Sequence, residues 1–362
     1  MKKKLLLINP SNPCKTGLTI NRSSRFPPLG LGIIAALTPD DWNVKIIDEN
    51  IEAFEFEEAD LVGITAFTAS AKRAYDIAKE YRERGISTII GGIHASMVPD
   101  EARIYVDTVV IGEVESIWAT VISDFENGKL KSIYQGELIN ADIIPKARHD
   151  LFHGGYMFGA VQTARGCPMD CEFCSVTQFN GHKYRQRPID DVLDEVKSIP
   201  QKMIFFVDDN ILGHGINANE RAIKLFKGMI SQGIKKDWFC QASINFADND
   251  EVLKYAAKSG CKMVFLGLEA EDEESLGSIN KKMNIKVGPD KYRDVIAKIN
   301  RHKIAVLVAF IYGLDNDSSE LLEKRIEYIV KSPVDVMQTT ILTPLPGTRL
   351  FKKFEDDERG FI

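Results

Sequence analysis

The sequence has few cysteines and no long hydrophobic run, and both absences narrow the class of protein. Six cysteines occur among 362 residues, and three of them stand together, so a disulfide framework is excluded and a reducing cytoplasm is expected. The apolar run Leu5–Ile8 follows a basic start but stops at Asn9-Pro10. It is too short for an export signal and predicts a strand. No window is apolar over enough residues for a membrane span.

An excess of positive charge is also missing. The formal net charge is -6, so there is no electrostatic case for a nucleic-acid partner. The hydrophobic share of 44% is ordinary for a globular protein, and 362 residues suffice for two domains. The stretch Leu29-Gly30-Leu31-Gly32 lacks the third glycine of a dinucleotide-binding fingerprint and follows no strand directly. We therefore do not interpret it as such a site.

What the chain does contain is a compact cysteine motif with the sequence CPMDCEFC. Cys167, Cys171 and Cys174 stand at i, i+4 and i+7 in one loop, so three thiolates can converge on one small cluster. A structural zinc site needs four closed ligands. Three ligands with one position left open suit a [4Fe-4S] cluster whose free iron binds a substrate or cofactor. The alternatives are three buried thiols or a zinc knuckle completed by His182.

Strands and helices alternate through the first half of the chain. Glycine or small polar residues follow the predicted strands, which is typical of a doubly wound, Rossmann-like parallel sheet with its ligand at the carboxyl ends of the strands. The predicted strands are 5–9, 44–47, 61–65, 88–90 and 107–111, with helices at 29–37, from about 68 to 84 and at 116–126.

The second half predicts a partial (β/α)6 barrel of the TIM type. Its six strand–helix units place the chemistry at the carboxyl ends of the strands, and the right-handed crossover rule makes their order nearly unique. The predicted strands are 158–163, 203–207, 238–243, 263–268, 305–312 and 336–342. The expected domains are thus 1–130 and 157–362, joined by a linker at 131–156 in which His149 and His153 belong to a loop rather than to a metal site.

The cysteine spacing, with Phe173 directly before the last cysteine, resembles the signature of the radical S-adenosylmethionine (SAM) enzymes. The resemblance implies that Cys167, Cys171 and Cys174 bind the cluster, that its open iron chelates SAM, and that one electron yields a 5′-deoxyadenosyl radical. It also implies an electron donor such as flavodoxin or ferredoxin. Cys240 and Cys261 stand in apolar surroundings and are expected to be packed core thiols. Cys14 stays unassigned.

The same resemblance assigns SAM contacts to carboxylates at two strand ends of the barrel. Asp208 and Asp209 look like the family's contact with the ammonium group of SAM, and helix capping is their alternative role. Glu269 resembles the residue that binds the ribose or methionine part. Its alternative is a buried, paired carboxylate.

Four further SAM contacts are expected. Gly313 resembles the glycine that lets adenine pack on the backbone, and Phe173 is expected to lie against the same adenine. Gln241 and Ser243 are expected to face the mouth of the barrel by strand alternation, with Phe239 and Ala242 out of phase.

Four stretches in order along residues 1–130 resemble the cobalamin-binding domain that precedes many radical SAM domains. They are Pro27–Gly32, Val62–Thr65, Gly91–Ala95 and Ile111–Glu115. Glycines at strand ends let a flat macrocycle approach the backbone closely. The DxHxxG motif that supplies a cobalt-binding histidine is absent, and the radical branch often leaves the lower cobalt face without one. The resemblance assigns cobalamin contacts to Thr65, Ser70, Gly91, Gly92, His94, Gly112 and Glu113.

Two of these cobalamin residues have an alternative of equal or greater weight. His94 is equally well explained as a loop histidine bonded to backbone. For Glu113 and Glu115, we favour the interpretation that one of the two makes a structural hydrogen bond.

Together the two resemblances imply a cobalamin-dependent enzyme that methylates an unactivated carbon of a small-molecule or lipid substrate. Positioning rather than acid–base chemistry would carry the rate, and no catalytic residue is identified. The alternatives are a non-methylating cyclase or carbon–carbon bond-forming enzyme, and a cobalamin carrier or sensor. A carrier or sensor does not need an iron with an open position, so the cysteine motif argues against this last alternative. Because many members of the family continue further, a substrate-shaping region is expected beyond Ile362.

Overall fold

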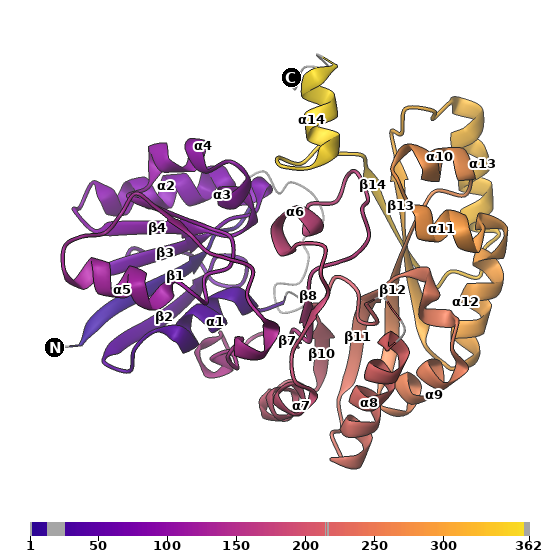
Figure 1. Cartoon of the computed structure of the whole chain (residues 1–362), viewed down its shortest axis with the longest axis horizontal. Coiled ribbons are helices and arrows are strands. Elements are labelled where there is room, and N and C mark those ends of the chain that lie inside the picture. Colours follow the sequence, from indigo (N-terminus) through magenta and orange to yellow (C-terminus); the bar gives the residue numbers. More distant parts are fainter. Residues whose placement is uncertain (1, 13–25, 214, 216, 358–362) are drawn as a thin grey trace. The chain divides into compact units, whose positions relative to one another are not determined.

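The computed structural model describes residues 2–12, 26–213, 215 and 217–357 (Figure 1). The chain divides into two compact units. Met1–Ala160 and Ser198–Gln201 form the first, and Val161–Lys197 and Lys202–Ile362 form the second. The unassigned Cys14 lies outside the described residues.

The first unit is built on a parallel sheet in which strand order reverses beside β1. The order is β2-β1-β3-β4-β5-β6, so β1 has its sequence neighbour β2 on one side and β3 on the other. Leu5, Leu6, Leu7 and Ile8 of β1 are fully buried, as expected for a strand covered on both faces. The strands are β1 (Lys3–Asn9), β2 (Trp42–Asp48), β3 (Leu61–Thr65), β4 (Ser87–Gly91), β5 (Thr108–Ile111) and β6 (Ile133–Gln135).

Helices cover both faces of this sheet (Figure 1). On one face α2 (Ala71–Arg82), α3 (Ile93–Met97) and α4 (Pro99–Tyr105) pack on the even-numbered side chains of β1. On the other face α1 (Leu29–Leu37) and α5 (Trp118–Glu126) pack on the odd-numbered ones. This alternation confirms the predicted doubly wound sheet.

Residues 131–156 differ from the linker expected from composition. They supply the edge strand β6, which pairs with β5, and two short 3-10 turns at Ala141–Ile143 and His149–Leu151. Ile139, Ala141, Ile144 and Ala147 are buried and form one apolar cluster with Ile33 of α1. Isolated apolar residues among polar ones therefore hold the segment against the first unit.

The second unit contains a parallel sheet of the predicted partial barrel. Its order is β14-β13-β12-β11-β10-β7, and the neighbouring strands from β10 to β14 pair in parallel. The strands are β7 (Phe158–Val161), β10 (Met203–Phe206), β11 (Asp237–Ala242), β12 (Cys261–Glu269), β13 (Ala305–Tyr312) and β14 (Val336–Ile341). Along β10 and β11, buried side chains alternate with half-buried ones, so one face is covered and the opposite face is apolar but partly accessible.

The helices of the second unit are of two kinds. The longer ones follow strands of the sheet in the sequence and cover it. They are α7 (Ile189–Ser198), α8 (Ala218–Ser231), α9 (Asp250–Lys258), α12 (Tyr292–Arg301) and α13 (Ser319–Val330). The shorter ones are α6 (Val176–Asn180), α10 (Glu273–Ser278), α11 (Lys282–Val287) and α14 (Arg349–Asp356). A short antiparallel pair, β8 (Ala164–Arg165) with β9 (Arg185–Gln186), brackets the cysteine motif.

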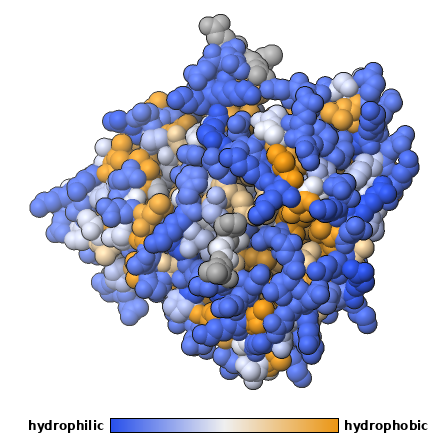
Figure 2. Space-filling view, turned by 45° about the vertical axis from the view of Figure 1, so that its right-hand side comes forward, coloured by the Kyte–Doolittle hydropathy of each residue, from blue (hydrophilic) through white to orange (hydrophobic). Residues whose placement is uncertain are grey.

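Hydrophilic residues cover most of the face shown in Figure 2, and hydrophobic residues form scattered groups between them. Within the described ranges, the chain has no helix whose length and apolar character would let it cross a membrane.

Candidate functional site

The cysteine motif forms a loop between β8 and α6, and distant segments of the chain hold it. The amide of Glu172 donates to the carbonyl of Ile279 (3.1 Å), and the amide of Leu350 donates to the carbonyl of Glu172 (3.0 Å). The Arg349 side chain pairs with the Asp170 carboxylate (2.9 Å) and donates to its carbonyl. The motif is therefore fixed against the turn after α10 and the start of α14.

All three thiols of the loop are free and half-buried. Burial raises the pKa of Cys167 and of Cys171, and it raises the pKa of Cys174 to about 11. The amides of Met169 and Val176 donate to the sulfurs of Cys167 and Cys174 and act in the opposite direction. Metal binding at this loop must therefore displace thiol protons, and the two amides are of the kind that tunes an iron–sulfur cluster.

The loop fits an iron–sulfur cluster better than a single zinc ion. In the part of the chain that the structure describes, no three His, Cys, Asp or Glu side chains converge on one ion. A zinc knuckle completed by His182 would need such a group, so the finding disfavours that alternative. A cluster spreads its thiolates over several irons, so its ligands lie farther apart than those of one zinc ion.

A buried ion pair that the sequence analysis did not find lies beside this loop. Lys281 Nζ is 2.7 Å from Glu269 Oε1 and 5.7 Å from the ring centre of Phe173. Burial lowers the pKa of Lys281, but the charge of Glu269 acts in the opposite direction, so the pKa is raised and the ammonium stays charged. The alternative given for Glu269, a paired carboxylate, is what the structure shows. Its φ of 68° is unusual for a residue other than glycine.

Phe173 and the end of β13 belong to one apolar cluster. Phe173 packs against buried residues that include Ile311 and Leu314, which flank Gly313 in the sequence. Gly313 has φ 85°, a conformation that favours glycine, and an added Cβ would meet nothing closer than 3.7 Å. The backbone there is open to a flat ligand, so the predicted adenine contacts of Gly313 and Phe173 stay compatible with the geometry.

The two carboxylates after β10 have different surroundings. Asp208 is fully buried, and its Oδ1 accepts hydrogen bonds from the amides of Thr163 (2.7 Å) and Ala164 (2.6 Å), so it holds the start of β8. Burial raises the pKa of Asp208 to about 6 and also raises the pKa of Asp209. Asp209 accepts one long bond from Asn180 (3.4 Å) and is the better placed of the two for a ligand ammonium.

On β11 one expectation about side-chain direction is wrong. Phe239 lies on the same half-buried face as Gln241, because side chains two residues apart point the same way in a strand. Its ring stacks on Phe205 of β10 with centroids 4.5 Å apart. Ser243, just beyond the strand, accepts a hydrogen bond from Asn210 (3.0 Å). The predicted SAM contacts of Gln241 and Ser243 stay predictions.

In the first unit, glycines stand at the ends of two neighbouring strands, β4 and β5. The sheet order places the switch point between β1 and β3, where doubly wound sheets of this order bind their ligand. Gly91 ends β4. The next residue, Gly92, has φ 92°, and a side chain would not fit there, because an added Cβ would lie 2.7 Å from Thr65 Oγ1. Gly112 after β5 has φ 77°. At Gly92 and Gly112 the glycines let segments of the unit pack closely, because an added Cβ would meet Thr65 or Gly136. The predicted cobalamin contacts of Thr65, Gly91, Gly92 and Gly112 stay predictions.

His94 is turned into the protein rather than toward a ligand. It is 5% exposed, its Nδ1 lies 3.2 Å from Thr68 Oγ1, and its Nε2 lies 3.2 Å from the hydroxyl of Tyr75. That hydroxyl also donates to Glu101 (2.9 Å). With both ring nitrogens engaged, the imidazole is not available as a cobalt ligand in this conformation.

Two other predicted cobalamin residues also have internal partners. Ser70 Oγ lies 3.3 Å from both the amide and the carbonyl of Phe67. Glu113 is buried, and its Oε2 accepts a hydrogen bond from the amide of Ile139 (2.9 Å). The structural hydrogen bond favoured for Glu113 or Glu115 is thus confirmed for Glu113. Ligand contacts of Ser70 and Glu113 stay predictions.

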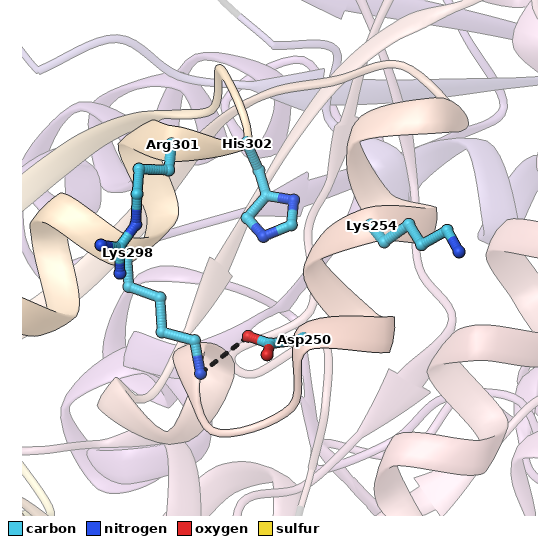
Figure 3. A pocket seen from close by; sticks show the side chains of 5 residues that line it. All are labelled: Asp250, Lys254, Lys298, Arg301 and His302. Atoms are coloured by element: carbon cyan, nitrogen blue, oxygen red, sulfur yellow. Dashed lines mark ion pairs between the residues drawn. The ribbon is translucent and has the colours of Figure 1, made fainter.

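Within the second unit, the cavity in Figure 3 lies away from the cysteine loop and the Glu269–Lys281 pair. It has a volume of about 470 Å³ and is shallow, and an ion pair of 2.9 Å between Lys298 and Asp250 lies at its edge. Arg301 and His302 of its lining precede β13, so the cavity is at the amino ends of the strands. The cysteine loop and the Glu269 pair lie at the carboxyl ends, where barrels carry their chemistry.

The fold and this site define a class: a doubly wound, B12-type sheet joined to a partial barrel that carries a three-thiol loop. Comparison with known families agrees. The B12 binding domain model matches residues 15–122, and the Radical SAM superfamily model matches residues 161–329.

Individual relatives point to the same family. The bacteriochlorophyllide d C-12(1)-methyltransferase of Chlorobaculum tepidum is 30% identical over 376 residues, covering 99% of this chain and 80% of that protein. The hopanoid C-2 methylase of Rhodopseudomonas palustris is 26% identical, covering 92% and 65%. The chain belongs to the family of cobalamin-dependent radical SAM methyltransferases.

The fold is shared with a solved member. The radical SAM methyltransferase TsrM from Kitasatospora setae, solved with cobalamin and a [4Fe-4S] cluster bound, matches with a TM-score of 0.77 at 16% identity. The match covers 99% of this chain and 78% of that one.

Replacing any one of Cys167, Cys171 or Cys174 by Ala is expected to abolish stable iron binding, because two thiolates do not retain a cluster with an open corner. The measurement is iron and sulfide content after anaerobic reconstitution. Cys240→Ala is the control, since this thiol is packed in the core of β11, and it is expected to keep the full content. Equal iron in the loop variants and the control would contradict the assignment.

Asp208→Asn is expected to change the pH dependence of stability. The raised pKa of Asp208, about 6, means that the folded state holds the proton more tightly than the unfolded chain. The native protein therefore loses stability as pH rises from about 4 to about 6, by about 2 to 3 kcal/mol. The side chain introduced by the substitution keeps an oxygen that can accept from the backbone amides of Thr163 and Ala164. Because it does not ionise, the stability of the variant does not fall over this pH range. Parallel urea-unfolding profiles from pH 4 to 7 for variant and wild type would refute the role of Asp208.

Proposed function

We propose that this protein cleaves SAM at a cluster held by Cys167, Cys171 and Cys174 and methylates an unactivated carbon of an apolar, ring-rich substrate with the help of cobalamin. The observation that carries the proposal is the anchored three-thiol loop beside the Glu269–Lys281 pair, on a chain whose first unit is of B12-binding type. When bound, the cluster supplies the electron that cleaves SAM and cobalamin supplies the methyl group.

The residues around the loop suit the charged end of SAM. Asp209 offers a carboxylate to the ammonium group, and Lys281 offers an ammonium to the carboxylate. Both side chains are largely buried, where such pairs are stronger than in water. The open backbone at Gly313 and the ring of Phe173 suit the adenine. These residues bind and orient, and positioning supplies the rate.

The half-buried face of the second sheet favours an apolar substrate. Strand register arranges its side chains in rows below Glu269, as in the layers of a barrel interior. Gly267 and Ala309 form a row of small residues, and the Glu269–Lys281 pair lies directly over Gly267, where it fills the position that an added Cβ would take. The two rows beneath are Gln241, Phe265, Leu307 and Val336, then Phe205, Phe239, Met263 and Ala305.

A face with one polar side chain among two such rows binds flat or fused rings better than a charged metabolite. The two named relatives act on a bacteriochlorophyllide and a hopanoid, a tetrapyrrole and a polycyclic lipid. We assign this chain to the same class of substrates. Its electron donor is a flavodoxin or ferredoxin, and it works in the cytoplasm, where the three cluster thiols stay reduced.

The test is anaerobic reconstitution with iron, sulfide, cobalamin and SAM under a chemical reductant, with a bacteriochlorophyllide or a hopanoid added, followed by mass analysis. A C-methyltransferase is expected to release 5′-deoxyadenosine and S-adenosylhomocysteine together and to add one methyl group to the substrate. Deoxyadenosine without S-adenosylhomocysteine would indicate a cyclase or another radical reaction. Neither product, with a Cys171→Ala variant that behaves like wild type, would indicate a carrier or sensor.

A further inference from the structure

Helix α13 buries a charged residue where an apolar one is expected. The structure describes the helix in full, and Arg325 is its one fully buried residue. The Arg325 side chain is 0% exposed. Removing a guanidinium from water is costly unless every part of it is paired. An arginine in this position therefore needs partners, and their location indicates what it holds together.

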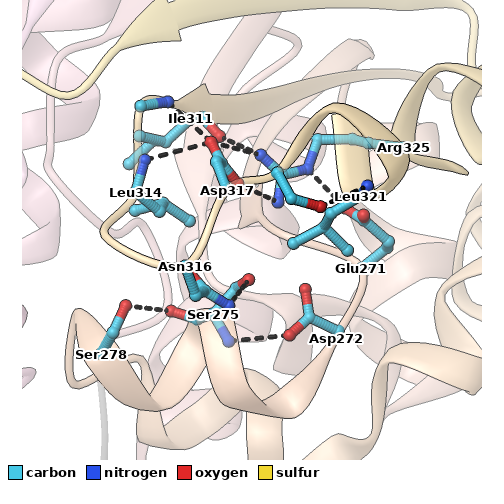
Figure 4. Close-up of polar contacts among 12 residues, drawn as sticks. Glu271, Asp272, Ser275, Ser278, Ile311, Leu314, Asn316, Asp317, Leu321 and Arg325 are labelled. Atoms are coloured by element: carbon cyan, nitrogen blue, oxygen red, sulfur yellow. Dashed lines mark hydrogen bonds and ion pairs between the residues drawn. The ribbon is translucent and has the colours of Figure 1, made fainter. Parts of the chain in front are cut away.

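The partners of Arg325 are two carboxylates and one main-chain carbonyl (Figure 4). Its Nε lies 2.7 Å from Glu271 Oε2, and its Nη2 lies 3.0 Å from Asp317 Oδ1. Its Nη1 donates to the carbonyl of Ile311 (2.8 Å). The guanidinium also lies 5.3 Å from the ring centre of Tyr312. The planar fork thus joins three separate pieces of chain.

Two of these pieces are the loops that leave β12 and β13 at the predicted SAM site. Glu271 stands two residues after Glu269, at the end of β12. Asp317 closes the loop after β13, because its Oδ2 accepts from the amides of Gly313 (2.7 Å) and Leu314 (3.1 Å). Through one carboxylate, Arg325 is therefore linked to the backbone at Gly313, whose φ of 85° it helps to fix.

A second contact joins the same two loops. Asn316 Nδ2 donates to Ser275 Oγ (2.9 Å), and Ser275 lies in α10, which follows β12. Asp272 caps this helix by accepting from the amide of Ser275 (2.8 Å). In Figure 4 both contacts lie below the Arg325 group. The strand ends that carry Glu269 and Gly313 are thus tied by one polar network.

We propose that Arg325 is a positioning residue for SAM: it holds the loops after β12 and β13 at the spacing that the nucleoside of SAM requires, without touching the cofactor. The inference rests on the proposed function, because it takes Gly313 and Lys281, the ion-pair partner of Glu269, as SAM contacts. Lysine cannot replace arginine here, since a single ammonium does not bridge two carboxylates and a carbonyl in a fixed plane.

The test compares wild type, Arg325→Lys and Arg325→Met in the reconstituted full chain. The readouts are the dissociation constant of SAM, from its effect on the spectrum of the reduced cluster, and iron content. Arg325→Met is expected to keep its iron but to bind SAM about tenfold more weakly or worse, the range seen when an outer-shell partner is removed. Arg325→Lys is expected to have a dissociation constant for SAM between those of wild type and Arg325→Met. The KM for SAM should rise more than kcat falls.

Ile299→Ala in α12 is the control, because Ile299 is fully buried but belongs to neither loop network. It is expected to lower stability while SAM affinity stays at the wild-type value. If Arg325→Met does not fold, the variants Glu271→Gln and Asp317→Asn are measured instead. Each removes the charge of one carboxylate partner of Arg325 and keeps an oxygen that can accept a hydrogen bond. Wild-type SAM affinity in the Arg325 variants, or in both substitutes, overturns the inference. Failure of the wild type to bind SAM overturns the proposed function instead.

Discussion

The site depends on two main-chain hydrogen bonds made by one residue of the cysteine loop. The amide of Glu172 donates to Ile279, and its carbonyl accepts from Leu350. Both partners lie more than a hundred positions further along the chain, so the loop takes its shape only when the second unit has folded. Because both bonds are made by backbone, they fix where the three thiols stand relative to the turn after α10 and the start of α14.

Around this anchor, most charged side chains at the strand ends hold loops rather than face a ligand. Asp208 holds the start of β8, His94 and Glu113 hold the loops of the first sheet, and Arg325 holds those after β12 and β13. Each engages its partners in a buried setting, where an unpaired polar group is costly. What remains for the cofactors is glycine backbone, aromatic rings and a few carboxylates and ammonium groups.

The sequence predicted the fold well where periodicity was strong. Helix α1 begins and ends where its apolar spacing indicated, and all six barrel strands were found. The short elements β6, α3 and α4 were missed, because three to seven residues carry too little periodic signal.

The site was predictable only in part. The three cysteines followed from their spacing, but Lys281 and Arg325 were not identified, because no motif marks either residue. Their roles arise from partners on other strands, which one sequence does not reveal. The face of Phe239 was predicted wrongly, although the alternation of β11 itself determines it.

The central claim is that three thiolates leave one iron open for SAM. The most direct measurement is electron–nuclear double resonance on the reduced, reconstituted protein with SAM isotopically labelled in its amino and carboxylate groups. The account predicts hyperfine coupling from both groups to the cluster, since both chelate the open iron. An intact cluster that shows no coupling to either label, with SAM bound in excess, would contradict it.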